Sequence, residues 1–327
     1  MSPRISIPLG PGRLFDGSPP PVLDPAGPYA GSITLLSWVL FAIAALVLAV
    51  VGTALWIAFF GKDRTRQRLG GTMVVWAGGI VFPVVVLTAL LVWGLSLTAS
   101  LSAGKGDVAD LRVRVTGEMW WWRVAYLDPR GDVIAWDANE LHIPAGRTVL
   151  VELESGDVVH SFWVPRLSGK VDMIPGRRNF VKIQADRPGV YSGQCAEYCG
   201  GPHALMGFVV VAHEPAEFSR LLAHMAAVSR EPKGGIAAEG QRLFDSAGCS
   251  ACHRIAGTGA NGLAGPDLTF VGRRRTLGAG ILPNNRGTMM GWIGDSQAIK
   301  PGNRMPAYRV LSADHLQSLA AYLEQQK

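Results

Sequence analysis

The sequence predicts a multidomain fold, in which a hairpin of two membrane-spanning helices precedes an all-β domain and an all-α domain. Three observations predict it. Two long runs near the start of the chain contain no charged residue. Short β-rich segments separated by Gly, Pro and Asp follow, from about residue 111 to residue 212. The last part of the chain carries a Cys-x-x-Cys-His motif among segments of helical character.

The domain boundaries are expected where the composition changes. We predict an irregular tail over residues 1–32, the helix hairpin over 33–102, the β domain over 103–212, a helix and linker over 213–235, and the α domain over 236–327. Within the fourth segment, residues 214–229 look helical, and the Pro and Gly residues of 231–235 end that helix.

The composition places part of the chain in a membrane. The 327 residues are 48% hydrophobic and only 17% charged, which is a low charged fraction for a soluble protein. The formal charge of +6 does not form one basic patch, because residues 105–212 hold twelve Lys or Arg against thirteen Asp or Glu. Residues 236–327 hold ten against six and are mildly basic. A nucleic-acid partner is therefore not expected.

The two spans are predicted over residues 33–60 and 72–101. About 20 apolar residues cross a bilayer, so both runs are long enough, although two buried core helices are an alternative. Pro83 in the second span is tolerable, because neighbouring groups can satisfy the freed backbone carbonyl. The short loop from Lys62 to Arg68 carries four positive charges, which the positive-inside rule places in the cytoplasm. The β and α domains are then expected on the periplasmic side of a bacterial inner membrane.

The β domain is predicted from seven short segments rich in β-branched and aromatic residues, with turn signals between several of them. These segments are 111–115, 122–126, 133–136, 148–153, 161–164, 179–184 and 208–211. Seven or more strands in about this length suggest an antiparallel sandwich. Residues 195–206 would then form a loop between the last two strands.

That loop holds two of the four cysteines of the chain, Cys195 and Cys199, together with His203 and Met206. One Cys, two His and a weak axial Met make a blue-copper site, and His160 supplies the distant imidazole. The second thiolate lets two sulfurs bridge two copper ions. Each ion would take both sulfurs and one His, and the remaining ligands would be the Met206 thioether on one ion and the Glu197 backbone carbonyl on the other.

Other metal-binding proteins use similar residues. A zinc site built from the two cysteines and His203 would not need Met206. A copper chaperone usually presents a Cys-x3-Cys pair in a thioredoxin-like α/β fold, and the β-strand context argues against it.

The other two cysteines lie in the attachment signature of a c-type haem. Cys249 and Cys252 would form thioether bonds to the haem, and His253 would be the proximal iron ligand. Met305 is the favoured sixth ligand, because it precedes a Pro and a predicted C-terminal helix over residues 312–325 with Ser312 as N-cap. Met289 and Met290 are the alternatives.

The Cys-x-Glu-x-Cys-x3-His-x2-Met motif with an upstream His resembles the CuA site of cytochrome c oxidase subunit II. The resemblance implies a cupredoxin-like fold for the β domain, and its binuclear CuA ligands would be His160, Cys195, Glu197, Cys199, His203 and Met206. The family also uses the Glu197 side chain for a magnesium ion shared with subunit I. In the family, electrons enter CuA through the first Trp of an aromatic cluster, which corresponds to Trp120. Trp121 replaces the Tyr that is common at the next position.

The haem segment resembles class I cytochromes c, and the order of the modules resembles subunit II of the caa-type oxidases. The resemblance implies that an external cytochrome c or an upstream respiratory complex reduces the haem, which passes electrons to CuA. Haem a of subunit I would receive them next, for reduction of oxygen to water coupled to proton pumping. Subunit III and the membrane are further implied partners.

Two other functions remain open on the sequence alone. A CuA-containing nitric oxide reductase would share the carrier role and reduce a different gas. A non-enzymatic copper-delivery or redox-sensing protein would release its copper readily to a chelator, whereas a buried bridged centre would retain it.

Overall fold

The computed structural model describes residues 20–227 and 234–327. The chain divides into two compact units, one over residues 31–102 and the other containing the remaining parts of the chain. The predicted tail up to residue 19 and the predicted linker over 231–233 lie outside the described residues.

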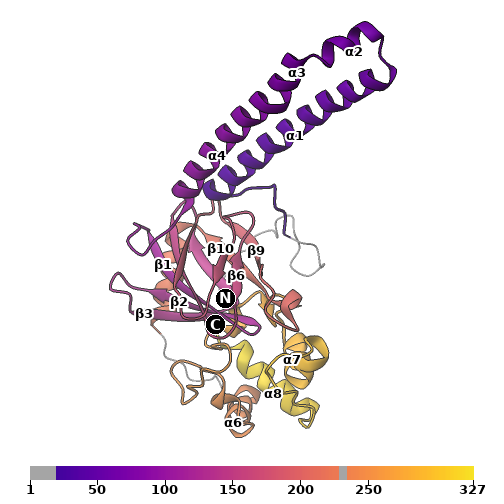
Figure 1. Cartoon of the computed structure of the whole chain (residues 1–327). Coiled ribbons are helices and arrows are strands. Elements are labelled where there is room, and N and C mark those ends of the chain that lie inside the picture. The colour runs from indigo at the N-terminus through magenta and orange to yellow at the C-terminus, as the bar shows by residue number, and fades with distance from the viewer. Residues whose placement is uncertain (1–19, 228–233) are drawn as a thin grey trace. The chain divides into compact units, whose positions relative to one another are not determined.

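Two long helices form the first unit and run antiparallel, side by side (Figure 1). The first is α1, Pro28–Phe60, and the second runs through α3, Thr72–Trp76, a π-helical segment, Ala77–Val81, and α4, Phe82–Leu101. Their most apolar windows have mean hydropathies of 2.7 and 2.5, and both are long and apolar enough to cross a membrane. Helix α1 begins at Pro28, five residues before the predicted start of the hairpin at residue 33.

The basic connection between them was expected to be a loop, but it contains a helix, α2, Asp63–Leu69. Asp63 lies in the first turn, and Arg66 and Arg68 lie in the last turn. Each charge is opposite in sign to the partial charge of the helix dipole at its end, which stabilises α2. Pro83 is the second residue of α4, two positions after the π-helical segment, and the helix continues through it as predicted. A π-helical turn is one of the local adjustments that accommodate such a residue.

The β domain is a sandwich of two five-stranded sheets. One sheet has the order β3-β2-β1-β5-β8, and its strands span Val133–Ala138, Trp121–Leu127, Leu111–Glu118, Val149–Ser155 and Asn179–Ile183. The other has the order β4-β10-β9-β6-β7, and its strands span Glu140–Pro144, Gly207–His213, Gly189–Cys195, His160–Trp163 and Val171–Met173. The seven predicted strands are all present, and β4, β7 and β9 were not predicted.

The prediction of a purely antiparallel sandwich is wrong, because each sheet contains one parallel pair. Strand β1 runs parallel to β5, and β10 runs parallel to β4. The chain changes sheets between β3 and β4 at Asn139, which has a left-handed φ of 61° and accepts a hydrogen bond from the Trp122 backbone amide. Consecutive strands in different sheets are not joined as hairpins, so they are free to pair in parallel with more distant strands.

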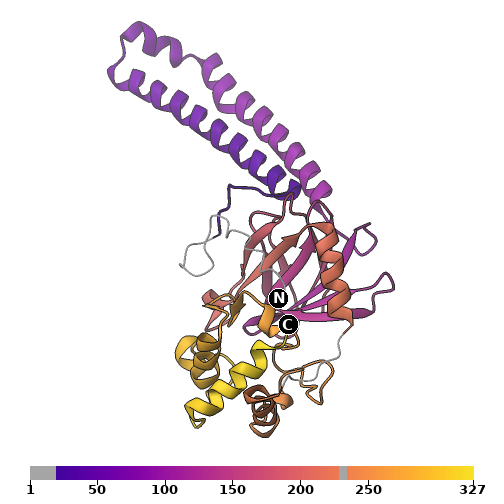
Figure 2. The ribbon, with the colours of Figure 1, turned by 180° about the vertical axis from the view of Figure 1, so that it is seen from behind.

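Alternating side chains from both sheets form the core of the sandwich, and the largest of them, Trp122, Tyr126 and Phe162, are almost completely buried. Helix α5, Pro215–Ala226, lies along the sandwich in Figure 2 and adds three apolar side chains to this core. This helix confirms the helical prediction for the described part of residues 214–229.

The α domain is built on three helices, α6, Ile236–Ser246, α7, Arg286–Ile299, and α8, Ala313–Glu324. A small two-stranded sheet of β11, Thr276–Leu277, and β12, Leu282–Pro283, precedes α7. Helices α6 and α8 pack closely at Gly240, where a Cβ atom would lie 2.0 Å from the Ser318 carbonyl oxygen. The Ser312 hydroxyl accepts a hydrogen bond from the His315 amide, which confirms the predicted N-cap of α8.

Candidate metal centre

Strand pairing brings His160 to the cysteine loop from 35 residues away. The loop joins β9, which ends at Cys195, to β10, and the Cys195 amide donates to the Met206 carbonyl across its base. Strand β6 begins at His160 and pairs with β9, with Phe162 opposite Cys195. The position of His160 therefore depends on β9, a strand that the sequence did not reveal.

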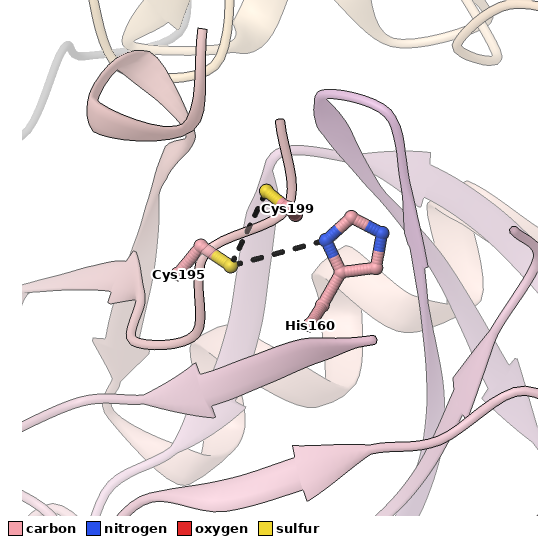
Figure 3. A group of neighbouring side chains, drawn as sticks. All are labelled: His160, Cys195 and Cys199. Atoms are coloured by element: carbon pink, nitrogen blue, oxygen red, sulfur yellow. Dashed lines mark hydrogen bonds between the residues drawn. The ribbon is translucent and has the colours of Figure 1, made fainter. Parts of the chain in front are cut away.

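The predicted copper ligands converge on the two sulfur atoms. Figure 3 shows His160, Cys195 and Cys199 pointing toward one another. The Sγ atoms lie 3.8 Å apart, and His160 Nδ1 lies 3.8 Å from the Cys195 sulfur. The remaining contacts are Cys195 Sγ to the Glu197 carbonyl oxygen at 3.2 Å, Cys199 Sγ to His203 Nδ1 at 3.4 Å, and Cys199 Sγ to Met206 Sδ at 3.7 Å.

This donor set fits a binuclear copper centre. Two sulfurs that bridge the same metal ions lie no farther apart than two metal–sulfur bonds, about 4.6 Å for a zinc-like bond of about 2.3 Å. The observed separation of 3.8 Å satisfies that limit. Each sulfur also has its own imidazole and its own weak ligand, a carbonyl or a thioether. Thiolate, imidazole and thioether donors are the combination that copper electron-transfer sites use.

The thiol pair holds one proton in the absence of metal. The hydrogen bond between the thiols lowers the pKa of Cys195 to about 3 and raises the pKa of Cys199. Burial opposes protonation of His160, but its hydrogen bonds with Cys195 and Asp157 raise its pKa overall. Binding of metal by both sulfurs and by the imidazole must therefore release protons.

His160 is oriented by groups that carry no signal in the sequence. Its Nε2 atom lies 2.9 Å from the Asp157 carboxylate, which leaves Nδ1 facing Cys195. Such a partner fixes the ring orientation of a metal-binding histidine. Gly117 in β1 leaves room for the ring, because a Cβ atom there would lie 2.8 Å from it.

Trp120 contacts the copper loop directly. Its Nε1 atom donates a hydrogen bond to the Cys199 carbonyl oxygen at 2.9 Å. The indole also packs on Gly200, which has a left-handed φ of 108°. The structure thus places Trp120 one hydrogen bond from a predicted metal ligand.

The Cys-x-x-Cys-His segment has its histidine prepared for a metal. His253 Nδ1 donates to the Pro266 carbonyl oxygen at 2.8 Å, so Nε2 is left as the ligating nitrogen. Gly265 lies against the imidazole, and a Cβ atom there would approach it to 2.6 Å. Burial lowers the pKa of His253, which favours the neutral form that binds iron. These residues fit a haem attached through Cys249 and Cys252.

Met305 lies in a loop whose backbone is firmly held. Its amide donates a hydrogen bond to the Asn303 side-chain oxygen at 2.8 Å, and its carbonyl accepts hydrogen bonds from Ser296 and Gln297. Tyr308, three residues further along, packs against the same core cluster as Cys249 of the haem motif. Met305, Met289 and Met290 all pack with the core of the α domain, so the choice of Met305 stays a prediction.

The magnesium role of Glu197 also stays a prediction. Its carbonyl oxygen faces Cys195, as the copper assignment requires. Among the described residues, the one group of three metal-binding side chains identified by close packing is His160, Cys195 and Cys199, and Glu197 is not part of it.

Comparison with known proteins supports the assignment of both domains. The family model for the periplasmic domain of cytochrome C oxidase subunit II matches residues 131–213, and that for cytochrome c matches residues 237–327. Cytochrome c oxidase subunit 2 of Alkalihalophilus pseudofirmus is 35% identical over 321 residues, which cover 93% of this chain and 90% of that protein. The same subunit of Bacillus subtilis is 28% identical over 339 residues, covering 95% and 94%.

A solved structure is also similar to part of this chain. The periplasmic domain of subunit II of cytochrome oxidase from Bradyrhizobium japonicum is 30% identical, with a TM-score of 0.34. The match covers 36% of this chain and 95% of that one.

Proposed function

The chain belongs to the cytochrome c oxidase subunit 2 family, and on this premise we propose that it is the electron-entry subunit of an oxidase that carries its own haem c. The observation that supports this most directly is the donor set around Cys195 and Cys199. Two sulfurs, two imidazoles, a thioether and a carbonyl meet where the loop between β9 and β10 approaches His160 of β6, and a cytochrome c domain follows in the same chain.

The proposed path of the electron runs from an external donor to the haem held by Cys249, Cys252, His253 and Met305. It continues through Trp120 to the copper centre and then to haem a of subunit I. When bound, the copper pair would supply one-electron exchange, and the protein would hold its ligands in place. Neither span, over residues 33–60 and 72–101, contains an Asp, Glu, Lys or Arg residue that could carry protons within the membrane. Oxygen chemistry and proton pumping are therefore assigned to the partner subunits.

The proposed orientation places the copper and haem domains on the periplasmic side of a bacterial inner membrane. The four positive charges near α2 support a cytoplasmic connection between the spans. Subunits I and III are the proposed partners, with a cytochrome c or an upstream respiratory complex as donor. The Glu197 carboxylate is proposed to bind magnesium at the subunit I interface. The backbone carbonyl of the same residue faces Cys195 at the copper centre, so the two sites would be adjacent.

Metal analysis of the purified oxidase tests the central proposal. We expect two copper ions in this subunit for each haem c, and an electron spin resonance spectrum in which one unpaired electron is shared by both ions. Cys199→Ser removes one bridging sulfur, so it should leave one copper or none and abolish oxidase activity while the haem remains attached.

The matched control is Tyr198→Phe, which changes the adjacent, exposed loop residue and removes no predicted ligand. It should keep both copper ions. Two intact, coupled copper ions in the Cys199→Ser protein would refute the ligand assignment, and a wild-type protein that holds zinc or a single copper would refute the function.

A further inference from the structure

Lys300 is an unusual residue in the haem domain, because a lysine is rarely buried without an acidic partner. It directly follows α7, and only 2% of it is exposed. Its Nζ atom donates to the Trp120 carbonyl oxygen at 2.7 Å and to the Gly278 carbonyl oxygen at 3.0 Å. Among the residues that the structure describes, no carboxylate lies within 4 Å of it to form an ion pair. Burial lowers the pKa of Lys300 to about 7, which reflects the energetic cost of placing an ammonium group there.

One of the two bonds of Lys300 joins the haem domain to the copper domain. Gly278 belongs to the haem domain, whereas Trp120 belongs to the copper domain. Through its indole nitrogen, Trp120 also bonds the Cys199 carbonyl. Two consecutive hydrogen bonds and one residue therefore connect Lys300 to a copper ligand.

The segment that begins at Lys300 also leads to the predicted iron ligand, Met305. Arg304, the residue before it, lies 3.6 Å from the Asp157 carboxylate. Asp157 in turn bonds the imidazole of His160. Residues 300–305 are here called the Met305 loop. Near one end the loop contacts Trp120, the partner of Cys199, and near the other end it contacts Asp157, the partner of His160.

Further contacts show that this interface is extensive. The Gly207 amide, next to Met206, donates to the Ala279 carbonyl oxygen of the haem domain at 3.0 Å. Arg274 and Asp137 form a buried ion pair at 2.8 Å between the two domains. All of these residues belong to one compact unit.

Building on the proposed function, we propose that Lys300 is a positioning residue, which fixes the Met305 loop against Trp120 for electron transfer from the haem of this chain to its copper centre. With both groups bound, the haem iron would be oxidised from the ferrous to the ferric state, and the copper pair would be reduced by that one electron. No bond forms or breaks, and no proton is transferred. Burial of the ammonium group costs stability, and its bond to the carbonyl of Trp120 offsets part of that cost.

Lys300→Met tests the proposal in the purified oxidase, because Met has a similar length and lacks the N–H donors. After photoreduction of haem c, we expect electron transfer to copper to be about tenfold slower. This factor corresponds to the loss of about 1.4 kcal/mol from one charged hydrogen bond. The melting temperature should not fall, since the variant no longer buries a charge. The haem absorption and the copper resonance should be unchanged.

The matched control is Arg309→Met, which also removes a positive charge from the haem domain. The Arg309 side chain forms its ion pair with Asp295 of the same domain and not with the copper domain. Its transfer rate should equal that of the wild type. An unchanged rate in Lys300→Met would overturn the proposal. A slower rate accompanied by a lower melting temperature or an altered copper signal would also overturn it, because it would indicate a structural role.

A second measurement needs no electron transfer. Acetylation of the wild-type oxidase with an N-hydroxysuccinimide ester, read by mass spectrometry, should modify the exposed Lys327 and leave Lys300 unmodified. Equal modification of both would overturn the proposal. Absence of copper or haem from the wild-type protein would instead refute the proposed function, and the two failures are therefore distinguishable.

Discussion

At the scale of single residues, the copper centre depends on small groups as much as on its ligands. Gly117 illustrates this, because it faces the His160 ring from the neighbouring sheet. In Gly117→Ala the added Cβ atom would lie only 2.8 Å from the nearest atom of the His160 ring, so the imidazole must move. We expect loss of copper with haem c still attached, measured as the ratio of copper to haem.

Gly201→Ala is the control for this prediction. Gly201 lies in the copper loop itself, and an added Cβ atom would meet nothing within 4 Å. Copper content should stay at the wild-type level in this variant. If Gly117→Ala also retained full copper, the close approach to His160 would not be a constraint on the site.

The iron ligand is a second question at this scale. Met305→Ala should abolish the thioether ligation of the haem and lower its reduction potential, because Met ligation raises the potential of a c-type haem. The absorption spectrum and a redox titration would report both changes. Met289→Leu, which conserves volume at a buried position, should change neither. A normal spectrum for Met305→Ala would assign the ligand to Met289 or Met290.

At the scale of secondary-structure elements, β4 carries a buried acidic residue whose charge opposes folding. Burial raises the pKa of Glu140 to about 7, although its carboxylate accepts a hydrogen bond from the Arg275 amide. The folded protein therefore keeps a proton that the unfolded chain releases between about pH 4.5 and pH 7. The contribution of Glu140 to stability is greatest below this window and decreases as the pH rises through it.

Glu140→Gln tests this prediction, because the amide is neutral at every pH. A shift of this size corresponds to about 3 kcal/mol, so the variant should gain up to about that much stability relative to wild type between pH 5 and pH 8. Thermal melting of both proteins at each pH measures the difference. Burial also lowers the pKa values of the neighbouring His142 and His213, and both proteins share that opposite trend. A constant difference across this pH range would contradict the prediction.

At the scale of the whole molecule, the copper and haem domains are joined by a buried ion pair that long-range folding creates. Arg274 and Asp137 are 137 positions apart and are both almost completely buried. Arg274→Met leaves the Asp137 carboxylate without its partner, and removal of one member of a buried pair typically costs about 3 to 5 kcal/mol. We expect a lower melting temperature and acetylation of Lys300 as the domains separate.

The double variant Arg274→Met with Asp137→Asn provides the comparison. It removes both charges, so much of the lost stability should return, and Lys300 should again be protected. If the single and double variants melted at the same temperature, the ion pair would not couple the two domains.

The sequence was sufficient wherever the chemistry is local. Cys195, Cys199, His203 and Met206 lie within twelve residues, so their spacing alone predicts a copper loop, and Cys249, Cys252 and His253 predict a haem site in the same way. The two spans follow from length and hydropathy alone. The N-cap at Ser312 is also a local signal.

Long-range pairing decided the rest. The sequence did not reveal β9, and its pairing with β6 is what brings His160 to Cys195. It also did not predict the parallel pairs or the bonds of Lys300 and Arg274 to the copper domain. Side chains in one short loop are held together by the covalent chain itself, whereas these contacts depend on which distant surfaces the folded chain brings together.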